Sequence, residues 1–317
     1  MVRWKPGSRS TNIEDRRGDG SSSGGGFGGL NLPMGGGKGC LGLGGGTVGI
    51  IVVVAVLLLG GGNIGDILGS GGGGSGGFPI GPDITLPGLP SAPGDSIPSG
   101  PESDADADLV DYVSFVLDDV QTTWRDEFTG AGERYDDATL VLFTEAVNSG
   151  CGTAQSASGP FYCPLDSKAY LDLDFFRELR DRFGAPGDFA QAYVIAHELG
   201  HHVQNLLGIN DKVQTQQQRN PDDANELSVR QELQADCFAG VWAHSTYERK
   251  ILEKGDLEEG LAAAASVGDD RIQKESTGRV DPESFTHGTS EQRQHWFTRG
   301  YDSGDIDRCD TFTAEEL

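Results

Sequence analysis

The sequence has few basic residues for its length and no cluster of them. Its 317 residues include 24 Lys or Arg against 49 Asp or Glu, which gives a net charge of −25. A nucleic-acid-binding surface needs a positively charged stripe or patch, because phosphate contacts dominate its affinity. The sequence contains no such stripe, so we exclude nucleic acid as a partner. The excess of acids indicates a highly solvated exterior and says little about the substrate.

Cysteine is also sparse, with five residues and no C-x-x-C pair. Such pairs are typical of zinc sites built from thiolates, so a cysteine zinc site is excluded. Cys151 and Cys163 flank a glycine-containing loop and can close a disulfide if the domain lies in an oxidising compartment. Free buried thiols are the alternative. A second pairing, Cys237 with Cys309, has no support in the local sequence.

Charge is absent from Gly39 to Gly65, and residues 48–59 within this stretch read V-G-I-I-V-V-V-A-V-L-L-L. This run is shorter than the about 20 residues of a membrane span, but uncharged glycine-rich flanks extend it. We therefore predict one transmembrane helix over residues 41–62. A buried strand is disfavoured because it has no nearby partner, and a signal peptide because no clear cleavage site follows.

Composition divides the rest of the chain. Residues 1–40 are rich in Gly and Ser and predict a disordered segment. Residues 63–105 are rich in Gly and then Pro and predict a linker, after which a folded domain is predicted over residues 106–317. Residues 1–46 carry six Lys or Arg and residues 60–108 carry none. The positive-inside rule then predicts a cell-membrane protein with a cytoplasmic N-terminus and an extracytoplasmic domain.

Hydrophobic periodicity within the folded domain predicts an α+β fold that is mostly helical with a small β-sheet. Helices are predicted over residues 109–128, 174–183, 188–207, 220–249, 256–273 and 290–301. Strands are predicted over residues 139–144 and 168–173. The polar, Gln-rich residues 210–219 are predicted to form a surface loop.

Residues 196–204, which read A-H-E-L-G-H-H-V-Q, carry the pattern of a metal site on a predicted helix. His197 and His201 are four apart, so their imidazoles lie on one helix face and can bind the same ion. Glu198 lies about 100° round the helix, where its carboxylate can reach a metal-bound water. The H-E-x-x-H arrangement is typical of zinc metallopeptidases, the alternative being surface histidines with a salt-bridging Glu. His202 is expected to face away.

A catalytic zinc site needs a third protein ligand and a position for water. The metzincin pattern requires Gly and His where the chain has Gln204 and Leu207, so that pattern is excluded. Glu232 follows on the next predicted helix among apolar residues, where carboxylates are rarely buried without a partner. We predict Glu232 as the third ligand, a solvated carboxylate being the alternative. Asp236, one turn further, is predicted to accept a hydrogen bond from a zinc-binding histidine.

The motifs resemble known zinc peptidases. H-E-L-G-H with a downstream E-L-Q-A-D looks like the gluzincin metallopeptidases. A closer resemblance is to the bacterial family of putative neutral zinc metallopeptidases. It rests on residues 3–18 and on C-G…G-P-F-Y-C-P, A-Y-L-D-L, H-E-L-G-H-H-V-Q and R-Q-E-L-Q-A-D-C-F-A-G-V-W-A, and it covers most of residues 107–309. The resemblance implies a membrane-anchored, gluzincin-like domain with Zn²⁺ as cofactor and a peptide or protein as substrate.

The resemblance also implies the roles of individual residues. Four form the reaction centre: the zinc ligands His197, His201 and Glu232 and the general base Glu198. Zinc lowers the pKa of its water to about 7, and Glu198 passes the water's proton to the leaving amine. His287 is the expected donor to the oxyanion and Arg293 its companion, with a loop histidine and a surface arginine as alternatives. The strand at 168–173 is interpreted as a sheet edge that binds substrate backbone.

These observations favour a membrane-anchored zinc metalloendopeptidase. One alternative is a non-catalytic, zinc-containing binding or assembly module at the membrane, which predicts loss of Glu198 or of a ligand; neither is lost. Another is a wholly cytoplasmic protein whose apolar run is a strand, which the cysteine spacing and the charge asymmetry oppose. Substrate, cleavage preference and oligomeric state do not follow from the sequence.

Overall fold

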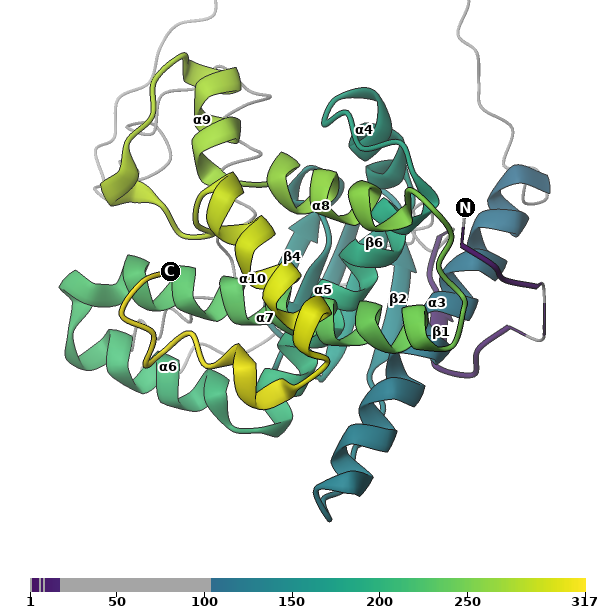
Figure 1. Cartoon of the computed structure of the whole chain (residues 1–317). Helices are drawn as coiled ribbons and strands as arrows, with labels where there is room; N and C mark the ends of the chain where they lie inside the picture. The colour runs from purple at the N-terminus through teal and green to yellow at the C-terminus, as the bar shows by residue number, and fades with distance from the viewer. Residues whose placement is uncertain (1, 6, 8, 18–103) are drawn as a thin grey trace, which may run out of the picture.

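The computed structural model describes residues 2–5, 7, 9–17 and 104–317. Within these ranges the fold is mostly helical, with a four-stranded sheet behind the central helices and a separate hairpin (Figure 1). The α-helices are α3 (Asp104–Gly130), α4 (Asp174–Asp181), α5 (Asp188–Leu206), α6 (Ile209–Arg219), α7 (Ala224–Glu248), α8 (Asp256–Ser266), α9 (Asp269–Thr277) and α10 (Ser290–Ser303). The α+β character predicted from the sequence is therefore present.

The sheet has the strand order β1-β2-β6-β5. Its strands are β1 (Ile13–Asp15), β2 (Thr139–Phe143), β6 (Lys168–Asp172) and β5 (Phe161–Cys163). The first three are parallel, and β5 runs antiparallel to β6 at the edge. A second, two-stranded sheet pairs β3 (Ala146–Ser149) with β4 (Gly152–Gln155). Parallel neighbours need long crossovers, and α3 lies between β1 and β2 in the chain.

The core forms where α5 packs against α3, α7 and α8, and α10 packs against α7. Its largest fully buried side chains include Trp124, Tyr193, Phe238 and Trp296. α7 and α10 approach so closely that a Cβ at Gly300 would overlap the backbone carbonyl of Cys237. Such a crossing tolerates only glycine, and it holds α10 against the middle of α7.

The predicted fold class is wrong in its transmembrane helix. Among the described residues, no helix is both long and apolar enough to cross a membrane. The longest, α3 and α7, have the length but contain several acidic residues each. The segment for which the helix was predicted, residues 41–62, lies outside the described residues, as does the predicted linker up to residue 103.

The prediction of disorder over residues 1–40 is also wrong for the described residues 9–17. β1 pairs with β2, and two backbone bonds flank it, from Leu140 to the Asn12 carbonyl and from Arg16 to the Leu142 carbonyl, each 2.8 Å long. The purple segment in Figure 1 accordingly runs beside β2 and α3. Average composition missed this strand because its stability comes from pairing with β2 rather than from its own apolar residues.

Two helix assignments also differ from the prediction. Residues 210–219 form most of α6 instead of a loop, because Val213 and Gln217, four apart, are both buried on its inner face. The helix predicted over residues 256–273 divides into α8 and α9. Between them Gly268 has extended backbone, and a Cβ there would overlap Ser290, so the chain bends tightly against the start of α10.

Candidate metal centre

The centre lies between α5 and α7. α5 begins at Asp188, after Gly187 in extended backbone, and ends before Gly208, which has the left-handed φ of 68°. Most of its residues are buried, which explains the apolar sequence around the motif. A Cβ at Gly200 would lie 2.9 Å from the carbonyl oxygen of Ala235. Glycine at this position therefore lets the two helices come close enough for their side chains to share one site.

Three of the predicted residues converge there. The Nε2 atom of His197 lies 3.2 Å from Oε2 of Glu232, and Nε2 of His201 lies 3.4 Å from Oε1 of the same carboxylate. Their donor atoms all lie within 4.8 Å of one another. The structure thus brings together the residues that the sequence analysis grouped, and their role as zinc ligands stays a prediction.

The spacing of these donor atoms fits a zinc ion. Zinc binds imidazole nitrogen and carboxylate oxygen at about 2.0–2.1 Å in a tetrahedron, so its ligand atoms lie about 3.3 Å apart. The distances of 3.2 and 3.4 Å to Glu232 match this value. Two imidazoles and one carboxylate are also a donor set of catalytic zinc sites, with the fourth position left for water.

Glu198 gives a second observation that fits a cation. Its side chain is buried, and Oε2 has no hydrogen-bond partner among the described residues. Burial raises the pKa of this carboxyl, because the charged form loses its hydration. Three carboxyl groups, those of Glu198, Glu232 and Asp236, lie near one guanidinium, that of Arg293. A cation bound beside them would add positive charge to this cluster, which fits the burial of three carboxyl groups.

His197 is held from behind by Asp236. Its Nδ1 atom donates to Oδ1 of Asp236 at 2.9 Å, and the hydroxyl of Tyr193 donates to the same oxygen at 2.5 Å. Arg293 donates from Nε to Oδ2 at 2.8 Å and from Nη2 to Oδ1 at 3.0 Å. All four side chains are buried. The imidazole therefore has one fixed orientation, with Nε2 toward Glu232.

These contacts also decide the charges. Burial alone would raise the pKa of Asp236, but Arg293 and His197 outweigh it and lower the pKa. Burial would likewise lower the pKa of His197, but Asp236 and Glu232 raise it to about 9. Asp236 thus lies where the sequence analysis expects it. Arg293 lies on Asp236, and no hydrogen bond of the described residues joins it to its expected companion, His287.

His201 has a neutral partner instead. Its Nδ1 atom lies 2.9 Å from Oε1 of Gln204, three residues later on α5. Glu232 is shared by both imidazoles: burial alone would raise its pKa, but His201 and His197 hold that pKa well below the usual range. The predicted third ligand is therefore an ionised carboxylate, the form that a metal ion binds.

His287 lies just before α10 and is held by Asp269 at the start of α9. Nδ1 of His287 donates to Oδ1 of Asp269 at 3.0 Å, while Oδ2 accepts the backbone N–H groups of Thr286, His287 and Gly288. Burial alone would lower the pKa of His287, but Asp269 and Glu232 raise it. The negative charge of Glu232 thus acts on the imidazole of His287. Asp269 occupies the Nδ1 atom of this ring, so Nε2 is its other nitrogen.

His202 faces away from the centre, as expected. Nε2 donates to the backbone carbonyl of Asp136 at 2.7 Å, and Nδ1 accepts from the hydroxyl of Tyr162 at 2.9 Å. Asn205 donates to the same hydroxyl at 3.1 Å. Burial lowers the pKa of His202, which therefore stays neutral and structural. His202 and Asn205 thus join α5 to β5 through hydrogen bonds to the Tyr162 hydroxyl.

The interpretation of residues 168–173 as the sheet edge is wrong. They form β6, which pairs with β2 on one side and β5 on the other. The free edge on this side is β5, which is also the strand attached to α5. With only three residues, β5 is too short for alternation of apolar residues to reveal it.

Sequence reasoning missed three side chains of this centre. Tyr193 and Gln204 lie four before His197 and three after His201, so helical spacing is a signal that could have found both. Asp269 has no such signal, because it lies on α9 and the imidazole that it holds lies in the loop before α10. Only the packing of α9 against the start of α10 brings the pair together.

Both of the disulfides that the sequence left open are present. Cys151 joins Cys163 with a Cα–Cα distance of 5.8 Å, which ties the β3–β4 hairpin to β5. Cys237 of α7 joins Cys309, near the C-terminus, with a Cα–Cα distance of 5.5 Å. The second bridge was the one without local support, because its partners are 72 residues apart.

Comparison with known proteins places these features in a family. The uncharacterized protein YpfJ of Escherichia coli (strain K12) is 45% identical over 315 residues, which is 98% of this chain and 99% of that protein. The uncharacterized protein Rv2575 of Mycobacterium tuberculosis (strain H37Rv) is 48% identical over 209 residues, 62% of this chain and 69% of that protein. No solved structure matches. The sequence model of the family described as "Putative neutral zinc metallopeptidase" matches residues 2–312, so the chain belongs to that family.

Proposed function

We propose that this protein is a zinc-dependent peptidase in which His197, His201 and Glu232 hold the ion. The observation that carries the proposal is the convergence of two imidazole Nε2 atoms on one carboxylate at 3.2 and 3.4 Å. The family supports the same reaction class and implies a peptide or protein as substrate.

Glu198 is the proposed general base. A zinc ion held by His197, His201 and Glu232 would supply a Lewis acid for activating water and polarising a scissile carbonyl. The Glu198 carboxylate accepts a proton from the attacking water at the unpartnered Oε2 and delivers it to the leaving amine nitrogen.

His287 and Arg293 take different roles in this proposal. Asp269 accepts from Nδ1 of His287, so Nε2 is the nitrogen left to donate to the oxyanion. Arg293 acts behind the ligands, where it keeps Asp236 ionised and thereby holds His197 in place. We further propose that the edge strand β5 binds the substrate backbone by adding a strand to the sheet.

The two disulfides bear on the compartment. Disulfides persist in oxidising surroundings and are rare where thiols are kept reduced. We propose on this basis that the domain works in an oxidising compartment. Labelling of free thiols in protein isolated from its natural host under acid quench would test it, since a reactive Cys163 or Cys309 contradicts the proposal.

The test of function compares the full chain with Glu198→Gln. Zinc content is measured after purification, and cleavage is measured by mass spectrometry of a mixed peptide library. We expect both proteins to hold one zinc ion and only the parent to cleave, because the amide cannot accept the proton. Equal cleavage by both would overturn the role of Glu198. Zinc in both and cleavage by neither would favour a non-catalytic zinc module.

A further inference from the structure

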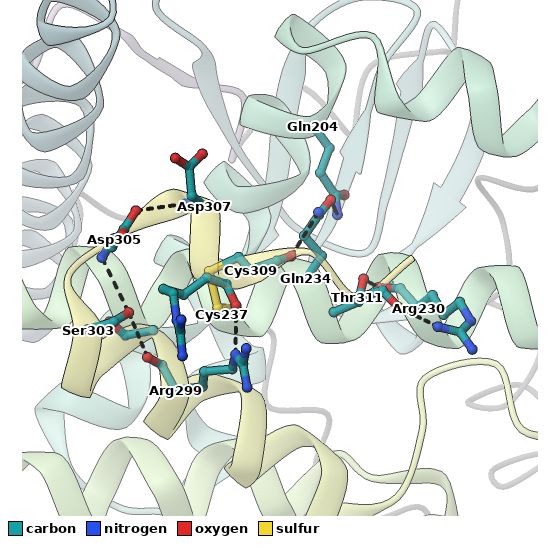
Figure 2. The surroundings of a disulfide bond; sticks show 12 residues. Gln204, Arg230, Gln234, Cys237, Arg299, Ser303, Asp305, Asp307, Cys309 and Thr311 are labelled. Carbon is teal, nitrogen blue, oxygen red and sulfur yellow. Dashed lines mark hydrogen bonds between the residues drawn. A yellow bond between two sulfur atoms is a disulfide. The ribbon is translucent and has the colours of Figure 1, made fainter. Parts of the chain in front are cut away.

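A chain of side-chain amides leads from His201 to the C-terminal segment. Gln204 accepts at Oε1 from Nδ1 of His201, and its Nε2 donates to Oε1 of Gln234 at 3.0 Å and to the Gln231 carbonyl at 2.7 Å. Gln234 then donates from Nε2 to the backbone carbonyl of Cys309 at 3.0 Å. Figure 2 shows Gln204, Gln234 and Cys309 in line beside the disulfide. We call this chain the amide relay.

The far end of the amide relay fixes the direction of each bond. A backbone carbonyl has no hydrogen, so Cys309 must accept and Gln234 must present its NH₂ group. The Oε1 atom of Gln234 then faces Gln204, which must present its own NH₂ group, as the Gln231 carbonyl also requires. Gln204 therefore turns its oxygen to His201, whose Nδ1 must carry the hydrogen. That tautomer leaves the lone pair on Nε2, the atom that faces the other ligands.

The amide relay is shielded and its far end is anchored. Gln204 is 0% exposed and Gln234 is 6% exposed, so solvent does not readily replace their bonds. The Cys237–Cys309 disulfide attaches the carbonyl's own residue to α7. Two residues later, the Thr311 hydroxyl donates to the Arg230 carbonyl at 2.6 Å and the Arg230 guanidinium donates to the Thr311 carbonyl. The last acceptor of the relay therefore has little freedom to move.

We propose that Gln204 and Gln234 are positioning residues that select the metal-binding tautomer of His201, and that the Cys237–Cys309 disulfide anchors the acceptor on which this selection depends. The proposal rests on the proposed function, because it takes His201 as a zinc ligand. It gives the C-terminal segment, far from the motif in sequence, a part in metal binding. It also explains why glutamines are buried at these positions of H-H-V-Q and E-L-Q-A-D.

The test measures zinc dissociation constants of the full chain by competition with a chromophoric chelator. The variants are Gln204→Met, Gln234→Met and a double Cys237→Ala, Cys309→Ala chain, since methionine keeps the side-chain length without hydrogen bonds. The matched control is Gln217→Met. Gln217 is also a buried glutamine, but it bonds to Ala224 and Ser228, away from the centre.

Loss of a ligand's hydrogen-bond partner typically weakens metal binding about 10–100-fold. We expect a loss in that range for Gln204→Met, a smaller loss for Gln234→Met and the disulfide variant, and no change for Gln217→Met. Gln204→Glu keeps an acceptor for Nδ1 and should recover part of the affinity. The visible spectrum of the Co²⁺-substituted protein should change with Gln204→Met and stay unchanged with Gln217→Met.

Thermal unfolding of the metal-free proteins separates folding from positioning. If all three methionine variants unfold at similar temperatures and only the relay variants lose zinc affinity, the proposal is supported. It is overturned if Gln204→Met binds zinc as tightly as the parent. A parent chain that binds no zinc would instead overturn the proposed function, so the two failures are distinguishable.

Discussion

The two histidines of the centre lie one turn apart on α5, yet the structure holds them by different means. Behind His197 is an ionised carboxylate, Asp236, which itself accepts from Arg293 and Tyr193. Behind His201 is the neutral amide of Gln204. A carboxylate raises the basicity of the imidazole it faces but needs a buried cation to offset its own charge. An amide fixes the tautomer of the imidazole without adding charge. Because only Asp236 adds a buried negative charge behind the two histidines, a single arginine, Arg293, is enough to offset it.

The comparison predicts its largest effect at Arg293. In Arg293→Met the carboxylate of Asp236 stays buried without its cation, which we expect to lower the free energy of unfolding by about 3–5 kcal/mol. Urea denaturation of the metal-free full chain measures this. Arg134→Met is the control, because its ion pair with Asp136 is exposed and should contribute less than about 1 kcal/mol. An equal loss of unfolding free energy in both variants would mean that the buried Asp236–Arg293 pair contributes no more than an exposed ion pair.

A second prediction concerns a variant in which both histidines have an amide behind them. Asp236→Asn replaces the carboxylate by an amide, so His197 would be held as His201 is. We expect zinc affinity to fall about 10–100-fold, because the imidazole loses its charged acceptor. Chelator competition measures the fall in zinc affinity. The control is Asp270→Asn, because the carboxylate of Asp270 accepts hydrogen bonds from Ser290 and does not contact His197 or His201. Unchanged affinity in Asp236→Asn would show that carboxylate and amide are equivalent here.

The Asp269–His287 pair extends the comparison to pH. Folding lowers the pKa of Asp269, so its contribution is present above the unfolded value of 3.8 and is lost as pH falls through the folded pKa. Folding raises the pKa of His287, so its contribution is present below 6.5 and is lost as pH rises through the folded pKa. The stability difference between the parent and Asp269→Asn should therefore be largest between these two values.

Urea denaturation from pH 3 to 9 measures that difference. We expect about 1.5–3 kcal/mol at its maximum, the range for a hydrogen bond to a charged group. Asp281→Asn is the control, because its carboxylate caps a short exposed turn. A stability difference between the parent and Asp269→Asn that is the same at every pH would show that the charges of Asp269 and His287 do not contribute to their interaction.

The smallest expected effect on the metal belongs to His202. Although it is adjacent to His201, its partners are Asp136 and Tyr162, outside the centre. His202→Leu should leave the zinc dissociation constant unchanged. It should lower the free energy of unfolding by about 0.5–1.5 kcal/mol, because the buried Tyr162 hydroxyl loses its acceptor but keeps the bond from Asn205. Chelator competition and urea denaturation on the same sample check both. A weaker zinc affinity would show that β5 also positions α5.

Local spacing explains which parts of the centre could be predicted. The helical repeat alone groups His197, Glu198 and His201. Glu232 joins them because it is a carboxylate among apolar residues of the next predicted helix, even though α6 between the two helices was predicted as a loop. The contacts of Arg293 and Asp269 depend on how α8, α9 and α10 fold back, and no periodic pattern encodes that. Composition likewise found the helical domain but not β1, because a strand paired with distant residues needs little apolar sequence of its own.

The pairing of β1 with β2 has a practical consequence for anyone producing this protein. A recombinant fragment that starts at residue 105 would retain every side chain of the metal centre, yet it would leave the backbone of Leu140 and Leu142 without the partners supplied by Asn12 and Arg16. An unpaired strand edge is a template for intermolecular pairing. The boundary suggested by composition therefore cuts through the sheet, and fragments made at that boundary should precipitate more readily than the whole chain.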